Sequence, residues 1–429
     1  MFLATTALEE FWDKDQKILF AGEWCRLYED RDKFKKLNYE IFPYQWSDSS
    51  DKDTALKDID KVYKKAIASL TKELNKHLGI NENERYYSII MGYWLTKFIH
   101  TNYDKFALLT RIKNQYNNKL KTKILEKDRH VVPIDLKEYS ALIRSDIYNL
   151  QEYSNIAVFL KIESESVKAK YLTQKYTFLS QKKYRNHIFF TLLNLFKKPE
   201  ICISAPYFTS LTSYLKIWNK SHNIVFQDFS FNVSFKMTKD YLFREKFLNF
   251  ECSTSFESYI SEHVLRSIPL VFVEGHRNLI NEIEKQKIPN SRLYYSAVGI
   301  YENLIYKFFI ASQSNIIKII NHQHGAGYGT DFECCDENYD LSVSDRFFTF
   351  GWSESAQTSY LPFEKLNIHH KNNNSKNTTL FLTDGHRYID RILYISQTSQ
   401  LIETSVNSVA NFLEKVNDKS IRVRFYPDN

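Results

Sequence analysis

Apolar runs that end in glycine-containing or polar turns recur along the chain and predict buried strands. The clearest covers residues 315–320 and is followed by the turn 321–329. Apolar residues at helical spacing predict helices over residues 51–78, 85–109 and 302–312. Strand, helix and strand follow one another through short loops, which predicts βαβ units and a parallel α/β sheet.

The same pattern gives the remaining expected elements. Further strands are expected in residues 17–25, 201–206, 224–228, 268–276, 292–297 and 346–352. Residues 171–198, 241–252 and 255–264 are expected to be helical, and 155–160 a short strand or the start of a helix. The charged stretch 120–148 is expected to form surface helix and loop.

A glycine-rich turn follows the predicted strand 315–320. It contains His322, His324, Gly325, Gly327 and Gly329. Ligands of open α/β sheets bind at the carboxyl ends of the strands, where glycine lets an anionic group approach the backbone. Imidazoles there can donate to phosphate or carry a proton near neutral pH. We therefore expect this turn to hold a phosphate-bearing substrate; the alternative is a tight turn with two surface histidines.

Other candidate side chains lie at predicted strand ends. Glu274 and His276 close the predicted strand 268–276, where either could serve as a base; the alternative is an ordinary polar turn. Glu23 follows another strand as a ligand contact or a partner of a helix N-terminus. Asp228 is a weaker candidate for the base, and Arg424 could bind phosphate through two hydrogen bonds or be a surface arginine.

Composition narrows the class of protein. The 429 residues suggest two or three domains, and 43% hydrophobic residues suffice for a real core. The net charge of +7 suits a phosphate-bearing partner, but it is too diffuse to predict nucleic-acid binding. Five irregularly spaced cysteines argue for a reducing, cytoplasmic compartment. No signal peptide and no run long enough to cross a bilayer is present, which leaves attachment to the inner face of the cytoplasmic membrane open.

No metal or cofactor is predicted. The arrangement of His322 and His324 with Cys334 and Cys335 fits no standard zinc spacing. Three Asp-x-Asp triplets, which begin at residues 13, 51 and 58, do not follow apolar strands and are expected to be solvated acids.

A polar stretch, residues 369–377, divides the chain. Residues 1–368 are expected to form a Rossmann-like domain with helical insertions. Residues 378–429 contain one predicted strand, helix and strand, over 378–383, 396–415 and 421–427. A single β-α-β unit leaves a parallel edge exposed, so we expect it to be the start of a second Rossmann-like domain that is cut short.

Several motifs resemble a family of bacterial O-antigen transferases. They are Phe2–Trp12, Ile18–Cys25, Arg85–Tyr87, Gly92–Leu95, Gln323–Gly325, Tyr328–Gly329, Ser344–Arg346, Gly351–Trp352 and Arg424–Pro427. The resemblance implies a two-domain GT-B glycosyltransferase of surface-polysaccharide synthesis. Its partners would be a nucleotide sugar and an oligosaccharide or lipid-linked acceptor, and it strengthens the expectation of a role for His324.

Three functions remain open from the sequence. The first is transfer of a sugar from a nucleotide donor, such as a CMP-linked keto-acid sugar. The second is transfer of another phosphate-linked group, such as a polyol phosphate, since His-Gly turns also occur in such enzymes. The third is a non-catalytic protein that binds carbohydrate or an assembly partner through its many aromatic side chains.

Overall fold

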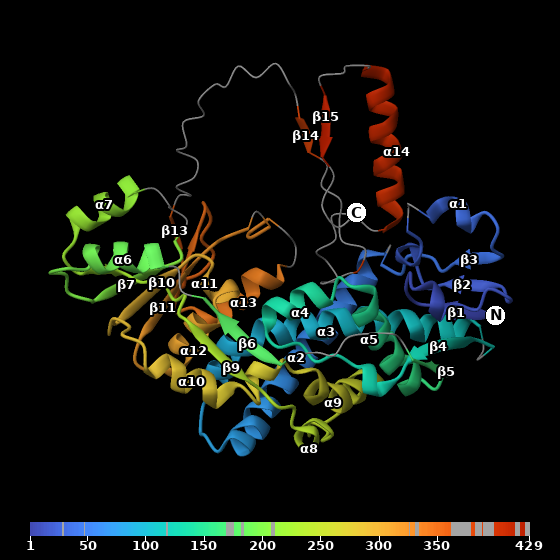
Figure 1. Ribbon diagram of the computed structural model, residues 1–429, viewed down its shortest axis with the longest axis horizontal. Helices are drawn as coiled ribbons and strands as arrows, with labels where there is room; N and C mark the ends of the chain where they lie inside the picture. The colour runs from blue at the N-terminus through green and yellow to red at the C-terminus, as the bar shows by residue number, and fades with distance from the viewer. Residues whose placement is uncertain are drawn as a thin grey trace.

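Two parallel sheets organise the first 361 residues of the computed structural model (Figure 1). The structure describes residues 1–27, 30–46, 48–116, 119–168, 176–181, 184–206, 211–325, 327–330, 334–361, 379–381, 388, 399–416 and 421–424. The expected α/β class, Rossmann-like and built on parallel strands, is confirmed. The range expected to be one Rossmann-like domain contains both sheets.

The first sheet has the strand order β3-β2-β1-β4-β5. Its strands are β1 (Phe2–Ala4), β2 (Ile18–Phe20), β3 (Tyr39–Ile41), β4 (Lys121–Leu125) and β5 (Glu163–Val167). This is the order of a dinucleotide-binding sheet, and the chain reverses direction across the sheet between β1 and β4.

The second sheet has the order β13-β12-β11-β10-β7-β8, also parallel throughout. Its strands are β7 (Ile201–Ser204), β8 (Ile224–Phe226), β10 (Leu293–Ser296), β11 (Lys318–His322), β12 (Arg346–Thr349) and β13 (Thr358–Tyr360). Here the order reverses between β7 and β10, where Ser296 pairs with Ser204. β6 (Thr177–Ser180) and β9 (Val233–Lys236) form a separate, small antiparallel sheet.

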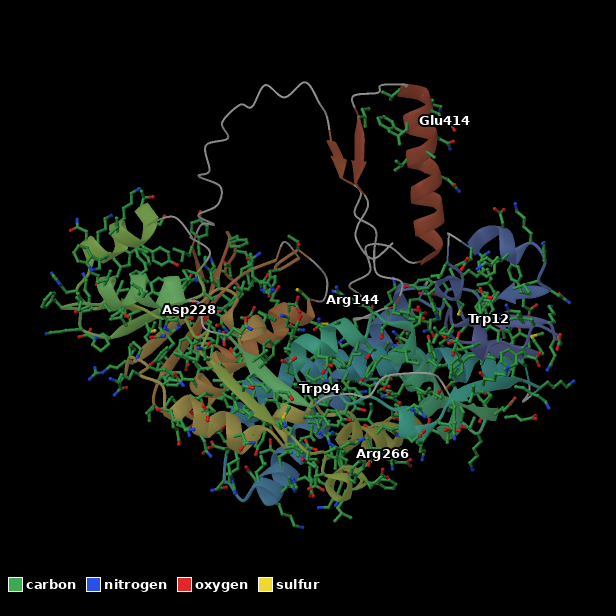
Figure 2. All side chains as sticks on the ribbon, viewed as in Figure 1. Trp12, Trp94, Arg144, Asp228, Arg266 and Glu414 are labelled. Carbon is green, nitrogen blue, oxygen red and sulfur yellow. The ribbon has the colours of Figure 1, made fainter. Side chains whose placement is uncertain are left out.

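A long buried helix, α3 (Glu84–Gln115), connects the two sheets. It packs against α2 (Ser49–Leu78) and α5 (Asp146–Phe159) on the side of the first sheet, and against α12 (Leu304–Ser312) and α13 (Cys335–Val343) on the other. Its Trp94 is fully buried near the middle of the molecule (Figure 2). Its buried residues are mostly apolar but also include Lys97, Asp104 and Lys105.

The other α-helices named here are shorter. They are α1 (Arg31–Phe34), α4 (Leu136–Leu142), α6 (Tyr184–Leu193), α7 (Leu211–Lys220), α8 (Tyr241–Arg244), α9 (Ser255–Ser267), α10 (His276–Glu284) and α11 (Gly299–Glu302).

The expected β-α-β unit near the end of the sequence is confirmed. β14 (Thr379–Phe381) pairs in parallel with β15 (Arg422–Arg424), and α14 (Ser399–Val416) connects them. The polar stretch 369–377 and the side chain of Arg424 lie outside the described residues.

The expected strand over residues 268–276 is wrong. Leu270–Phe272 form a short 3-10 helix, and α10 begins at His276. The backbone N–H groups of Leu270 and Val271 donate to the carbonyls of Pro133 and Ile134, at 2.9 and 3.0 Å. A short apolar run predicts burial, but by itself it does not distinguish a strand from other buried backbone.

Four further expectations need correction. The stretch 120–148 contains β4, which pairs with both β1 and β5 and is therefore an interior strand. The two lysines of β4 interrupt the apolar run by which a buried strand is recognised in a sequence. The range 171–198 contains β6 as well as helix α6, and helix in 241–252 is limited to α8, Tyr241–Arg244. Residues 155–159 form the end of α5, and Leu160 is its C-cap.

Candidate functional site

The glycine-rich turn lies at the carboxyl edge of the second sheet, as expected. β11 ends at His322, and the chain then turns away through Gln323, His324 and Gly325. His324 is partly exposed, with 22% of its side-chain surface accessible. Its ring packs against that of Tyr301, with 4.3 Å between centroids. His324 is therefore held in place by packing while it keeps access to solvent.

A chain of hydrogen bonds supports His324 from behind. Nδ1 of His324 lies 2.8 Å from the hydroxyl of Tyr328, and that hydroxyl donates to Oδ2 of Asp340 at 2.8 Å. Tyr301 also donates to Oδ2 of Asp340, at 2.8 Å. Asp340 is fully buried, and burial raises its pKa well above the usual range, although both tyrosines counteract the shift. The arrangement links a solvent-accessible imidazole to a buried carboxyl group through a phenol.

Gln323 fixes the direction in which the turn leaves the sheet. Its Oε1 accepts from the backbone N–H of Phe350 at 2.9 Å and from Nε1 of Trp352 at 3.0 Å. Its Nε2 donates to the carbonyl of Gly325 at 2.8 Å. The buried amide thus ties the turn after β11 to the loop after β12. Two motifs that are separate in the sequence meet at this point.

Gly329 is the glycine of the turn whose conformation requires glycine. Its φ is +67°, and a Cβ built there would lie 2.7 Å from the indole of Trp352. Its backbone N–H donates to the Glu337 carboxylate at 2.8 Å. This amide is therefore already occupied by an anion of the protein itself.

Acidic side chains line the start of α13 beside the turn. Asp336 and Glu337 stand in its first turn, and Asp340 follows one turn later. Carboxylates at this position repel a phosphate but stabilise a cation such as imidazolium. Where these acids are ionised, they favour a proton acceptor at His324 over a phosphate-binding group.

His322 lies in a different environment from His324. It is buried, its Nδ1 lies 2.7 Å from the hydroxyl of Tyr295, and its Nε2 lies 3.3 Å from the carbonyl of Leu361. Burial lowers its pKa to about 4. The sequence-based expectation that His322 joins His324 in binding substrate gains no support from this geometry.

Glu274 and His276 are not at a strand end. Glu274 forms a buried two-point ion pair with Arg244, at 2.6 and 2.7 Å. His276 is buried at the start of α10, with Nε2 at 2.8 Å from the hydroxyl of Tyr86, and burial lowers its pKa to about 4. Tyr86 precedes Tyr93, the α3 residue that contacts Tyr301, by two helical turns, or about 10 Å. Both residues therefore lack the position for which they were selected.

Of the remaining candidates, Glu23 and Asp228 lie away from the turn and Gly327 lies within it. Glu23 follows β2 at the carboxyl edge of the first sheet, where it pairs with Arg26 and lines a small pocket with Trp24 and Tyr44. Gly327 accepts a hydrogen bond from the N–H of Thr330 in the turn. Asp228 lies beyond the end of β8, beneath α6 (Figure 2). The structure brings together His324 and the glycine turn, but not Glu23, Glu274 or His276.

Sequence reasoning missed Asp340 and Tyr301. Asp336 and Asp340 are spaced four residues apart, which is the spacing of one helix face, and this was the available indication. No helix was expected over residues 335–343, so the acids were not placed beside the turn. Only the fold shows that these acids lie on the helix beside His324.

Two chemical roles are open to this cluster. With Asp340 ionised, Tyr328 donates to it and His324 donates from Nδ1, so that the Nε2 lone pair can accept a proton. With Asp340 protonated, the donors can reverse and Nε2–H can donate to an anion. No group of three or more His, Cys, Asp or Glu side chains that could hold a metal ion occurs within the described ranges. No helix of the described part of the chain is long and apolar enough to span a membrane.

The parallel sheets place this chain in the general class of Rossmann-like α/β proteins, and an imidazole–phenol–carboxyl chain lies at the end of one strand. The family comparison makes this more specific. The model of the LIC12162 family of transferases matches residues 1–429, and the chain belongs to that family. Neither the search of curated proteins nor the search of solved structures found a match.

Proposed function

We propose that this transferase moves a sugar from a nucleotide-activated donor to a growing surface polysaccharide, and that His324 is the general base. The observation that carries the proposal is the hydrogen-bonded chain His324–Tyr328–Asp340 at the carboxyl edge of the second sheet. Glycosyl transfer requires removal of a proton from the acceptor hydroxyl as the new bond forms.

The surroundings of His324 suit this step. When Nε2 takes the proton, the positive charge develops 3.8 Å from Oδ2 of Asp340, across the Tyr328 hydroxyl. A buried carboxylate stabilises imidazolium in this way in other acid–base sites. In this proposal Tyr328 and Asp340 are positioning residues, because they act on the substrate only through His324.

The donor class is tested first. Turnover is measured on CMP-, UDP- and GDP-linked sugars and on CDP-linked polyols, with acceptor oligosaccharide present. Turnover of a nucleotide sugar supports the proposal. Turnover of the CDP-linked polyol alone would instead assign transfer of a polyol phosphate, and a lack of donor binding throughout would favour a non-catalytic protein.

The site is tested on the active donor with His324→Asn. We expect kcat to fall on the order of 10²–10³-fold with little change in KM for the donor. Asp340→Asn and Tyr328→Phe should lower kcat by smaller factors and alter its pH profile. His322→Asn, at the end of β11, is the matched control. If His324→Asn raised KM for the donor and left kcat unchanged, His324 would be a phosphate-binding residue and the base would lie elsewhere.

A further inference from the structure

The basic charge of the chain is concentrated in one segment. Residues 181–223 contain seven lysines or arginines and one glutamate, a net charge of +6, whereas the whole chain has +7. This segment includes α6 and α7, which form one end of the molecule along its long axis (Figure 1). The remaining residues of the chain are almost neutral in sum.

These helices and the turn that follows α6 expose large apolar side chains. We call them the α6–α7 patch: Ile188, Leu192, Leu195, Phe196, Leu215 and Trp218, each between 37% and 98% exposed. Ile188, Leu192 and Leu195 follow one another at helical spacing, and so do Leu215 and Trp218. Nε1 of Trp218 donates to the carbonyl of Leu193 at 2.7 Å, which joins the two rows into one surface.

The inward side of these helices is already packed. Leu193 is buried with Ile203 and Phe226, and Phe190, Tyr214 and Ile217 pack against them. The amide of Asn194 bonds both the carbonyl and the N–H of Phe226, at 2.8 and 2.9 Å, and so ties the end of α6 to β8. The outward apolar residues are therefore additional to what the fold needs.

Phe196 is the most exposed large side chain of the patch. It is 98% exposed and has a φ of +63°, a conformation that costs a bulky residue free energy. Lys198, Lys216 and Lys220 are exposed in the same segment, and none of them forms an ion pair with an acidic side chain among the described residues. Lys197 lies over the ring of Trp218, 4.5 Å from its centroid.

From this combination we propose that the α6–α7 patch binds an anionic lipid surface. Exposed aliphatic and aromatic residues in a segment that also exposes lysines match a membrane interface, where the apolar groups enter the acyl region and the lysines meet the headgroups. A nucleic acid would use the lysines but leave Ile188, Leu192 and Leu195 unburied. A second copy of the chain would bring like charges together.

The proposal concerns attachment and does not depend on which group the enzyme transfers. Vesicle binding is measured without donor or acceptor, so its failure is distinct from failure of the proposed function. Attachment at α6–α7 would hold the second sheet, whose edge strand is β8, close to a membrane-bound acceptor.

The test compares flotation of the protein with phosphatidylcholine vesicles and with vesicles that contain about one-third phosphatidylglycerol. We expect binding to the anionic vesicles only, and loss of binding at high salt. Phe196→Asn removes the most exposed aromatic ring of the patch, so the variant should bind about tenfold more weakly. Asparagine tolerates the positive φ, so the variant should fold normally. Lys216→Gln with Lys220→Gln should weaken binding about fivefold per lysine.

Leu242→Asn on α8 is the matched control. Leu242 is 86% exposed, but residues 237–252 carry three basic and three acidic side chains and no net charge. This variant should bind vesicles like the wild type. Equal binding to neutral and anionic vesicles, or unchanged binding of Phe196→Asn, would overturn the proposal. A wild-type protein that does not bind vesicles would also overturn the proposal. If Phe196→Asn then abolished self-association or RNA binding, the patch would bind a second copy of the chain or RNA instead.

Discussion

His322 and His324 stand one residue apart, yet they lie in different environments. His322 belongs to β11 and is enclosed by Tyr295, Phe348 and Phe350, with both ring nitrogens near protein partners. His324 lies beyond the strand and keeps access to solvent. Alternation of residues along an extended strand would have placed both on one side, but the strand ends between them.

Lys307 provides a prediction at the residue scale. It is fully buried in α12, and its Nζ lies 5.5 Å from the ring centroid of Tyr339 but has no hydrogen-bond partner among the described residues; burial lowers its pKa to about 7. The unfolded chain binds this proton up to a pKa near 10.5, so the folded state is penalised at lower pH and gains stability as pH rises from 7 toward 10. Replacement by methionine should remove the penalty.

We expect Lys307→Met to raise the free energy of unfolding at pH 7 by about 2–4 kcal/mol. Urea unfolding of wild type and variant is measured across pH 7 to 10, and the advantage of the variant should shrink as pH rises. A variant that is less stable than the wild type at pH 7 would show that Lys307 has a partner or a structural role.

At the scale of single elements, the turn after β11 depends on two features that lie close together. Gln323 ties it to the loop after β12, and Gly329 allows the close approach of Trp352. Both features restrain the segment that carries His324 and Tyr328. The geometry of the proposed base is therefore a property of the turn as a whole.

Gly329→Ala tests this restraint, and Gly79→Ala is its control. Both glycines have nearly the same φ, +67° and +68°, but a Cβ at Gly79 meets nothing within 4 Å. Gly79→Ala should cost about 1 kcal/mol of stability and leave turnover unchanged. Gly329→Ala should cost about 1–3 kcal/mol more because of the Trp352 contact, and should lower kcat.

Chemical denaturation and donor turnover measure these effects. Equal destabilisation by the two variants would show that the Trp352 contact relaxes without cost. Full activity of Gly329→Ala would show that the turn does not set the geometry of His324.

At the scale of the whole molecule, α3 makes the two sheets one structural unit. It packs against α5 of the first sheet and against α12 and α13 of the second. Arg85 at its start also forms an ion pair with Asp345, at 2.6 Å, and the Asp345 carboxylate accepts from the N–H of Ile319 at the beginning of β11. The Arg85 and Asp345 motifs therefore meet at the amino edge of the second sheet, away from the site.

Because α3 is shared, we expect both sheets to unfold together. Hydrogen exchange measured by mass spectrometry in increasing denaturant should show peptides with β1 and peptides with β11 losing protection at the same concentration. Loss of protection in β1–β5 at a clearly lower concentration would show that the first sheet is an independent folding unit.

The sequence by itself determined the alternation of strands and helices, the parallel α/β class and the position of the glycine turn at a strand end. These follow from local periodicity and turn chemistry, which act over a few residues. It also pointed to the motifs around Gln323 and Trp352, but it did not show that they meet.

Only the tertiary structure decided which polar residues share a site. Glu274 was selected from a local pattern, but Arg244, thirty residues away, holds it in a buried ion pair. Asp340 was not selected, although it lies behind His324 once α13 packs beside the turn. Burial and hydrogen-bond partners depend on contacts between distant segments, and these contacts separate a solvent-accessible imidazole from a buried one.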